Sequence, residues 1–280
     1  MEDPCIISAS RRTDIPACYP DWFINQLIKG YVEVSNPYSH TASTISLKPE
    51  NVHSIVLWSK NFVPLLPKLK DISDYEFFFM FTLNDCSQLE PGIPSLQQRF
   101  TQLDTIISAY GPKRLFVRFD PIIFWKQDGR IRNNLGSYEK ILQKLNSSGI
   151  NSLKTSFMDV SYNKLKTRGI DFLTPPLEKK RNIAKRMATL AGNYGIRLQF
   201  CCNDAVLSGG DIPNAEKSSC INGRRISEIT GKKVSLRKDP SQRKECGCTV
   251  SRDIGSYTQV CENGCLYCYA NPKGLLKSDT

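Results

Sequence analysis

The sequence lacks any apolar run that approaches the ~20 residues a membrane-spanning helix needs. It has no low-complexity tract and no repeat at a short fixed period. Its opening residues, Met-Glu-Asp-Pro, are acidic where a secretory signal would be basic and then apolar. Histidine is scarce, and His40 and His53 lie far in sequence from the cysteine-rich end. We therefore expect a cytoplasmic protein that contacts no membrane.

The composition is that of an ordinary globular protein. The chain has 280 residues, of which 40% are hydrophobic and 10% aromatic, enough for one large α/β domain or two modest ones. Eleven cysteines are present, and six of them fall in the last quarter of the chain. A reducing compartment disfavours a disulfide framework, whereas clustered thiolates are typical ligands of a metal or an iron–sulfur centre.

Short apolar segments alternate with amphipathic ones over the first two hundred residues. The predicted strands are Cys5–Ser10, Tyr31–Ser35, Ser54–Trp58, Glu76–Leu83, Arg114–Phe119, Ser152–Phe157 and Arg197–Cys201. The predicted helices are Pro20–Lys29, Ser95–Tyr110, Leu135–Ser147 and Leu177–Tyr194, several of which end at a glycine. This alternation predicts an α/β fold with parallel strands, and seven strands favour a full or partial (β/α) barrel over an open two-sided sheet.

The pattern changes near residue 202. From there the periodicity is lost, and residues 217–252 contain ten Lys or Arg against three Asp or Glu, which accounts for +7 of the net charge of +11. We expect a barrel-like domain over residues 1–202 and a basic, cysteine-rich, loop-rich cap over residues 203–280. Metal binding can stabilise a segment of this kind.

Polar residues follow the predicted strands at their carboxyl ends, where parallel α/β folds carry their reactive groups. Arg11, Arg12 and Asp14 follow the first strand, and Arg118 and Asp120 lie at the end of the fifth. We interpret these five as candidate catalytic residues that orient an anionic or zwitterionic ligand. An Arg–Asp pair at this position could equally be a structural clamp between strands.

Three cysteines near the carboxyl terminus form the strongest motif. Cys261, Cys265 and Cys268 are spaced Cys-x3-Cys-x2-Cys, and Gly264 permits a tight turn between them. Three thiolates this close can hold three corners of a cubane cluster and leave the fourth iron without a cysteine ligand. An open coordination position is a place for chemistry, as it is in catalytic zinc sites.

This spacing, with an aromatic residue before the last cysteine, resembles the radical S-adenosylmethionine enzymes, and its Tyr-Cys-Tyr ending resembles the spore photoproduct lyase branch. The resemblance implies a [4Fe–4S] cluster, S-adenosylmethionine as cofactor, a barrel fold and an electron donor such as flavodoxin or ferredoxin. Together with the basic segment, it also makes nucleic acid a candidate substrate. Most members carry the cysteine loop after the first strand, whereas here it comes last.

The whole chain also resembles DUF1848, an uncharacterised bacterial family. The segments that carry this resemblance are Ser8–Pro16, Asn36–Tyr38, Ser46–Glu50, Trp58–Asn61, Arg118–Pro121, Gln242–Cys248 and Gly264–Ala270. It names a family without a reaction.

A second set of cysteines could hold another centre. Cys201, Cys220, Cys246 and Cys248 make a complete set for an auxiliary [4Fe–4S] cluster or for tetrahedral zinc. Cys201 could equally be a small buried residue that closes its strand. We expect Cys202 to be a buried packing residue of this kind, as we do Cys5, Cys18 and Cys86. An alternative function is a non-catalytic zinc or iron–sulfur module that binds nucleic acid through the basic segment.

Overall fold

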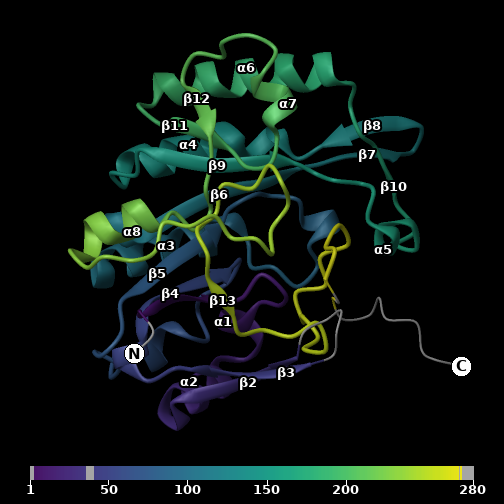
Figure 1. Cartoon of the computed structure of the whole chain (residues 1–280). Coiled ribbons are helices and arrows are strands. Elements are labelled where there is room, and N and C mark those ends of the chain that lie inside the picture. Colours follow the sequence, from purple (N-terminus) through teal and green to yellow (C-terminus); the bar gives the residue numbers. More distant parts are fainter. Residues whose placement is uncertain (1–2, 36–40, 271, 273–280) are drawn as a thin grey trace, which may run out of the picture.

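A parallel sheet of eight strands runs through the molecule (Figure 1). The computed structural model describes residues 3–35, 41–270 and 272. The strands of this sheet, in chain order, are β1 (Cys5–Ala9), β4 (Val52–Ser59), β5 (Phe77–Thr82), β6 (Leu115–Ile122), β9 (Ser152–Phe157), β11 (Arg197–Phe200), β12 (Ala215–Lys217) and β13 (Arg252–Asp253). Their order in space is β12-β11-β9-β6-β5-β4-β1-β13, so the predicted α/β class is confirmed.

The central strands form because they are apolar on both faces. All side chains of β4 and β5 are buried, as expected for parallel strands covered on both sides. Phe77, Phe79 and Phe81 of β5 belong to the large core packed under the helices, whereas Phe78 and Met80 point to the opposite face. That opposite face packs against Cys220, Cys246 and Cys248, which brings the cysteine-rich part of the chain onto the sheet.

The four predicted helices form close to their expected bounds. They are α2 (Pro20–Lys29), α3 (Leu96–Tyr110), α4 (Tyr138–Ser147) and α6 (Leu177–Asn193). Ser95 caps α3 by accepting a hydrogen bond from the backbone N–H of Gln98, and α2 ends at Gly30 with φ 77°. Shorter helices are α1 (Ile15–Cys18), α5 (Asn163–Lys166), α7 (Asp204–Leu207) and α8 (Gly223–Thr230). The 3₁₀ helices are Pro49–Asn51, Leu66–Leu69, Ser87–Leu89, Pro112–Arg114 and Leu135–Ser137.

One predicted strand lies outside the main sheet. Residues Tyr31–Ser35 form β2, which pairs antiparallel with β3 (Ala42–Ser46) in a separate hairpin. The burial of β2 alternates along the strand, the pattern of a sheet with one solvated face, so its placement in the parallel sheet was wrong. A third small sheet comprises β7 (Phe124–Gln127), β8 (Arg130–Asn133) and β10 (Asp171–Phe172). Asn36–Tyr38 lie outside the described residues.

Both edges of the main sheet come from the chain beyond residue 202. Strand β12 pairs with β11, and β13 pairs with β1 at Ile7 and Ser8. No pairing of β12 with β13 closes the sheet among the residues described, so a closed barrel stays a prediction. In the same ranges, no helix combines the length and the apolar character needed to cross a bilayer.

Candidate functional site

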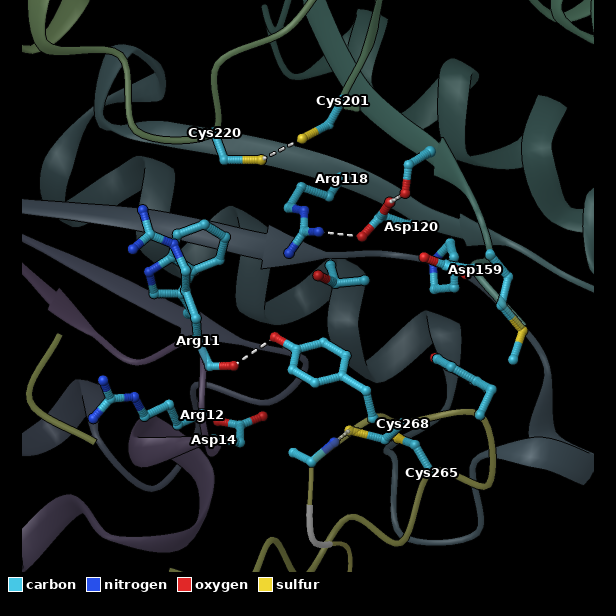
Figure 2. A pocket seen from close by; sticks show the side chains of 18 of the residues that line it. Arg11, Arg12, Asp14, Arg118, Asp120, Asp159, Cys201, Cys220, Cys265 and Cys268 are labelled. Carbon is cyan, nitrogen blue, oxygen red and sulfur yellow. Dashed lines mark hydrogen bonds and ion pairs between the residues drawn. The ribbon is translucent and has the colours of Figure 1, made fainter. Parts of the chain in front are cut away.

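A cavity of about 320 Å³ opens where the strands of the main sheet end. Ser10, Ser59, Thr82, Phe157 and Cys201, each at or just after the carboxyl end of a strand, line it. This is the edge at which parallel α/β folds bind their ligands. The cysteines of this cavity form two thiol groups that lie on opposite sides of it. One group contains Cys201 and Cys220, and the other contains Cys265 and Cys268 (Figure 2).

Arg118 and Asp120 lie between the two thiol groups (Figure 2). Both come from the end of β6, and they form an ion pair inside the cavity. Asp120 also accepts a hydrogen bond from Ser156, and the Arg118 guanidinium lies 5.3 Å from the ring centroid of Trp58. Burial opposes the charge on Arg118, but Asp120 and the facing thiols outweigh it and raise its pKa. Arg118 is therefore a permanent cation in the cavity.

Arg11 is held by a carboxylate that the sequence did not single out. Asp253 of β13 accepts hydrogen bonds from Ser8 Oγ at 2.8 Å, Ser10 Oγ at 2.6 Å and the backbone N–H of Arg11 at 2.8 Å. The Arg11 guanidinium also lies 5.3 Å from the Trp58 ring centroid. Its Nη2 is buried and has no hydrogen-bond partner, which leaves one donor for a ligand.

Arg12, the next residue, is held in a different way. Its Nη1 donates to the carbonyl of Gly255 at 3.0 Å, and its guanidinium lies 5.9 Å from the ring centroid of Tyr257. Gly255 follows β13, so this contact again joins the loop after β1 to the last strand of the sheet. Arg12 still lines the cavity beside Arg11.

Asp14 joins the first strand to the carboxy-terminal cysteine motif. It caps α1 by accepting from Ala17 N at 3.1 Å, and it accepts from Lys60 N at 3.2 Å and Asn263 Nδ2 at 2.8 Å. Asn263 lies between the first two cysteines of the motif. Burial raises the pKa of Asp14 to about 6, although these donors act to lower it. Asp14 therefore positions the motif loop.

The tail thiols, which we define as Cys261, Cys265 and Cys268, all line the cavity. Burial raises the pKa of Cys268 to about 11 and raises that of Cys265 well above its ordinary value. The backbone N–H of Ala270 donates to Cys268 Sγ at 3.4 Å. Because buried thiols of this kind ionise only beside a strong cation, the group suits a bound metal centre.

A buried polar network holds the loop that carries the tail thiols. Tyr267 donates a hydrogen bond to Glu90, and Lys60 Nζ donates to the same carboxylate oxygen at 2.8 Å. The backbone of Gly92 lies so close to Asn263 that a Cβ on it would come within 2.9 Å of Asn263 Cα. The position of the motif thus depends on a glycine far away in sequence.

Cys18 lies beside the tail thiols. Its thiol contacts that of Cys261, and the backbone N–H groups of Glu262 and Asn263 face it; the contact with Cys261 is the main cause of a lowered pKa at Cys18. Tyr19 OH donates to Val260 O at 2.6 Å, and Asp14 accepts from Asn263. The residues that flank α1 on both sides of Cys18 are therefore bonded to the loop of the cysteine motif. Sequence spacing gave no signal for this pairing, and the expectation that Cys18 only packs was incomplete.

The second thiol group contains five cysteines rather than the four expected. It comprises Cys201, Cys202, Cys220, Cys246 and Cys248. Cys202 has φ 51°, a left-handed conformation that is uncommon for a side-chain-bearing residue. In an extended strand Cys201 and Cys202 would point to opposite faces, but here their Sγ atoms lie 3.7 Å apart. The interpretation of Cys202 as a packing residue was therefore incomplete.

All twelve predicted site residues line the same cavity: Arg11, Arg12, Asp14, Arg118, Asp120, Cys201, Cys220, Cys246, Cys248, Cys261, Cys265 and Cys268. Within residues 3–35, 41–270 and 272, however, no three His, Cys, Asp or Glu side chains surround a point as the ligands of one metal ion do. A multi-iron cluster distributes its ligands over several metal atoms, so this finding bears on a single ion more than on a cluster.

Comparison with known proteins identifies the family and leaves the reaction open. A search of curated proteins found no match. Among solved structures, a crystal structure of the IOLI protein with a bound zinc atom shares 9% identity and a TM-score of 0.28, over 70% of this chain and 51% of that one. The chain thus spans about half of that structure. The sequence model "Domain of unknown function (DUF1848)" matches residues 6–270. The chain therefore belongs to the DUF1848 family.

Proposed function

We propose that this protein is a radical S-adenosylmethionine-type enzyme whose tail thiols hold a [4Fe–4S] cluster. The observation that carries the proposal is the position of these thiols. The last cysteine motif of the chain lies at the carboxyl edge of a parallel sheet, in one cavity with Arg118 and Asp120. Although the cysteine motif comes last in the chain, its thiols therefore lie in the same cavity as Arg118 and Asp120.

The donor set fits the cluster. Three soft sulfur ligands line one cavity, a backbone N–H donates to Cys268 Sγ, and Lys60 lies within electrostatic reach of Cys265 and Cys268. Hydrogen bonds and nearby charge are the means by which proteins tune iron–sulfur centres. When bound and reduced, such a cluster supplies the single electron that cleaves S-adenosylmethionine.

The remaining groups of the cavity bind and orient. Arg11 offers the unpartnered Nη2 to an anionic group, and Arg118, held by Asp120, places a second cation beside the same Trp58 ring. Guanidinium groups prefer carboxylates and phosphates as partners. Asp14 holds the motif loop through Asn263. These contacts support an anionic or zwitterionic ligand.

The same arrangement supports a partial (β/α) barrel under a cap. Residues beyond 202 add β12 and β13 to the two edges of the sheet, and the loops between them carry thiols into the cavity.

Anaerobic reconstitution with iron and sulfide tests the proposal. We expect iron–sulfur absorption and, after reduction with dithionite, formation of 5′-deoxyadenosine from S-adenosylmethionine. Cys265→Ser should abolish both the tail cluster and the cleavage, whereas Cys5→Ser, at the distant start of β1, should change neither. A stable tail cluster that never cleaves S-adenosylmethionine would refute the enzymatic proposal and leave an electron-transfer or structural role.

A further inference from the structure

The second thiol group forms a compact cluster of sulfur atoms. Cys201 Sγ lies 3.7 Å from both Cys202 Sγ and Cys220 Sγ. The thiol of Cys246 contacts those of Cys201 and Cys202, and Cys248 contacts both Cys220 and Cys246. All five cysteines are free of disulfides.

The spacing suits thiolates that share a metal centre. With Zn–S bonds of about 2.3 Å, the sulfur atoms of a tetrahedral site lie roughly 3.8 Å apart. The Sγ–Sγ distances of 3.7 Å from Cys201 to Cys202 and to Cys220 agree with this value. The sulfur atoms are in pairwise contact and do not yet surround one point, so binding must draw them around a shared centre.

A buried ammonium group faces the cluster without an acidic partner of its own. Lys154 is 7% exposed, and its Nζ donates to Gln199 Oε1 at 2.6 Å and Ser218 Oγ at 3.4 Å. Among the described residues no carboxylate forms an ion pair with it. Burial lowers the pKa of Lys154, and the acidic groups that act to raise it are the thiols of Cys220, Cys248 and Cys201. A buried charge requires a counter-charge, which these thiols supply only when ionised.

Two guanidinium groups add to this positive surrounding. Arg118 faces Cys220 and Cys201, and Arg11 faces Cys248 and Cys220. Each has a carboxylate partner as well, yet the buried Nη2 of Arg11 has none. Four thiolates around a divalent ion, or around a [4Fe–4S]²⁺ core, carry a net charge of about −2, which these cations would balance.

We propose that Cys201, Cys220, Cys246 and Cys248 bind a thiophilic metal, either zinc or the iron of a cluster, with Lys154 as its buried counter-charge. Cys202 contacts this centre as a fifth thiol. Ligation of Zn²⁺, or of a preassembled [4Fe–4S]²⁺ core, replaces the thiol protons, which leave to solvent, and changes no oxidation state. The inference does not depend on the chemistry of the tail thiols.

Metal analysis of a full-length variant without tail thiols tests the centre. Cys261→Ser/Cys265→Ser/Cys268→Ser is purified from zinc-supplemented cells and, separately, reconstituted with iron and sulfide. We expect it to retain zinc or an iron–sulfur cluster, and acid-labile sulfide tells the two apart. Retention should be lost when Cys220→Ser/Cys248→Ser is added and kept when Cys5→Ser is added. A chain that binds neither metal without its tail thiols would overturn the proposal.

Alkylation of the wild-type protein tests the same centre without any substitution. Metal-loaded and chelator-treated protein are alkylated, and the labelled cysteines are identified by peptide mass spectrometry. We expect Cys201, Cys220, Cys246 and Cys248 to be protected only when metal is present. Equal labelling of these four in both samples would contradict the assignment.

The role of Lys154 is tested by competition with a chromophoric chelator. Lys154→Gln should weaken metal binding roughly 10–100-fold, as loss of a group next to a metal site does. Lys140→Gln, at an exposed position of α4, is the matched control and should have no effect. An unchanged affinity in Lys154→Gln, with circular dichroism that shows a native fold, would remove Lys154 from the centre.

Discussion

Replacing Asp14 with asparagine should remove a pH-dependent cost of folding. The pKa of this carboxyl group is raised from 3.8 to about 6, chiefly by burial. Because the folded-state pKa lies above the unfolded one, the folded protein binds the proton more tightly than the unfolded chain does. The cost of ionising Asp14 is therefore absent below about pH 4, grows as the pH rises through 6, and is complete at neutral pH.

The size of the effect follows from the pKa shift. Each pKa unit corresponds to about 1.4 kcal/mol, so the shift amounts to roughly 3 kcal/mol. Asp14 keeps partial exposure at the cavity, and solvent screening reduces this figure. We expect the stability of wild type relative to Asp14→Asn to fall by about 1–3 kcal/mol between about pH 4 and pH 7.

Urea unfolding of metal-free protein, followed by tryptophan fluorescence, measures this difference. Asparagine can keep only some of the three hydrogen bonds that Asp14 accepts, so Asp14→Asn differs from wild type in stability at every pH. The informative quantity is therefore the change of this stability difference with pH. Asp74→Asn, at an exposed position, is the control. A stability difference between Asp14→Asn and wild type that is the same at every pH would refute the reasoning.

Three further predictions concern the walls of the cavity. Gly92→Ala should displace the motif loop and lower iron retention at the tail thiols. Gly136→Ala, with no atom within 4 Å of its added Cβ, should leave iron retention unchanged. Equal iron content in Gly92→Ala and wild type would contradict the contact between Gly92 and Asn263. Arg118→Gln leaves the half-buried Asp120 without its cation and should cost roughly 1–3 kcal/mol in urea unfolding, less than a fully buried pair would; a loss below ~0.5 kcal/mol would show that the pair is solvated. Cys18→Ala should make the reconstituted tail cluster lose iron faster under mild oxidation, measured by absorbance, and an unchanged rate would separate Cys18 from that cluster.

The fold was predictable where local signals agree with burial. Ser95 with Gln98 three residues on defines the start of α3, and the continuous apolar segments define β4 and β5. Tyr31–Ser35 was correct as a strand but wrong as a member of the sheet. Its one-sided burial suits a hairpin, and strand propensity carries no information about the partner.

The site was predictable as a set and not in its pairings. The rule that polar groups gather after parallel strands identified Arg118 and Asp120 correctly as cavity residues. Cys18 and Cys202 were missed for two physical reasons. The contact of Cys18 with Cys261 spans most of the chain, and the orientation of Cys202 depends on a backbone turn that sequence does not specify.

The pairing of β13 with β1 also dictates when the protein can mature. Ser8 and Arg11 are made long before the carboxylate that holds them, since 242 positions separate Arg11 from Asp253. Contacts of such long range form late and slowly. A nascent chain therefore exposes its early cysteines before the cavity exists, and an inorganic centre can be loaded only after β13 and the tail thiols have been made.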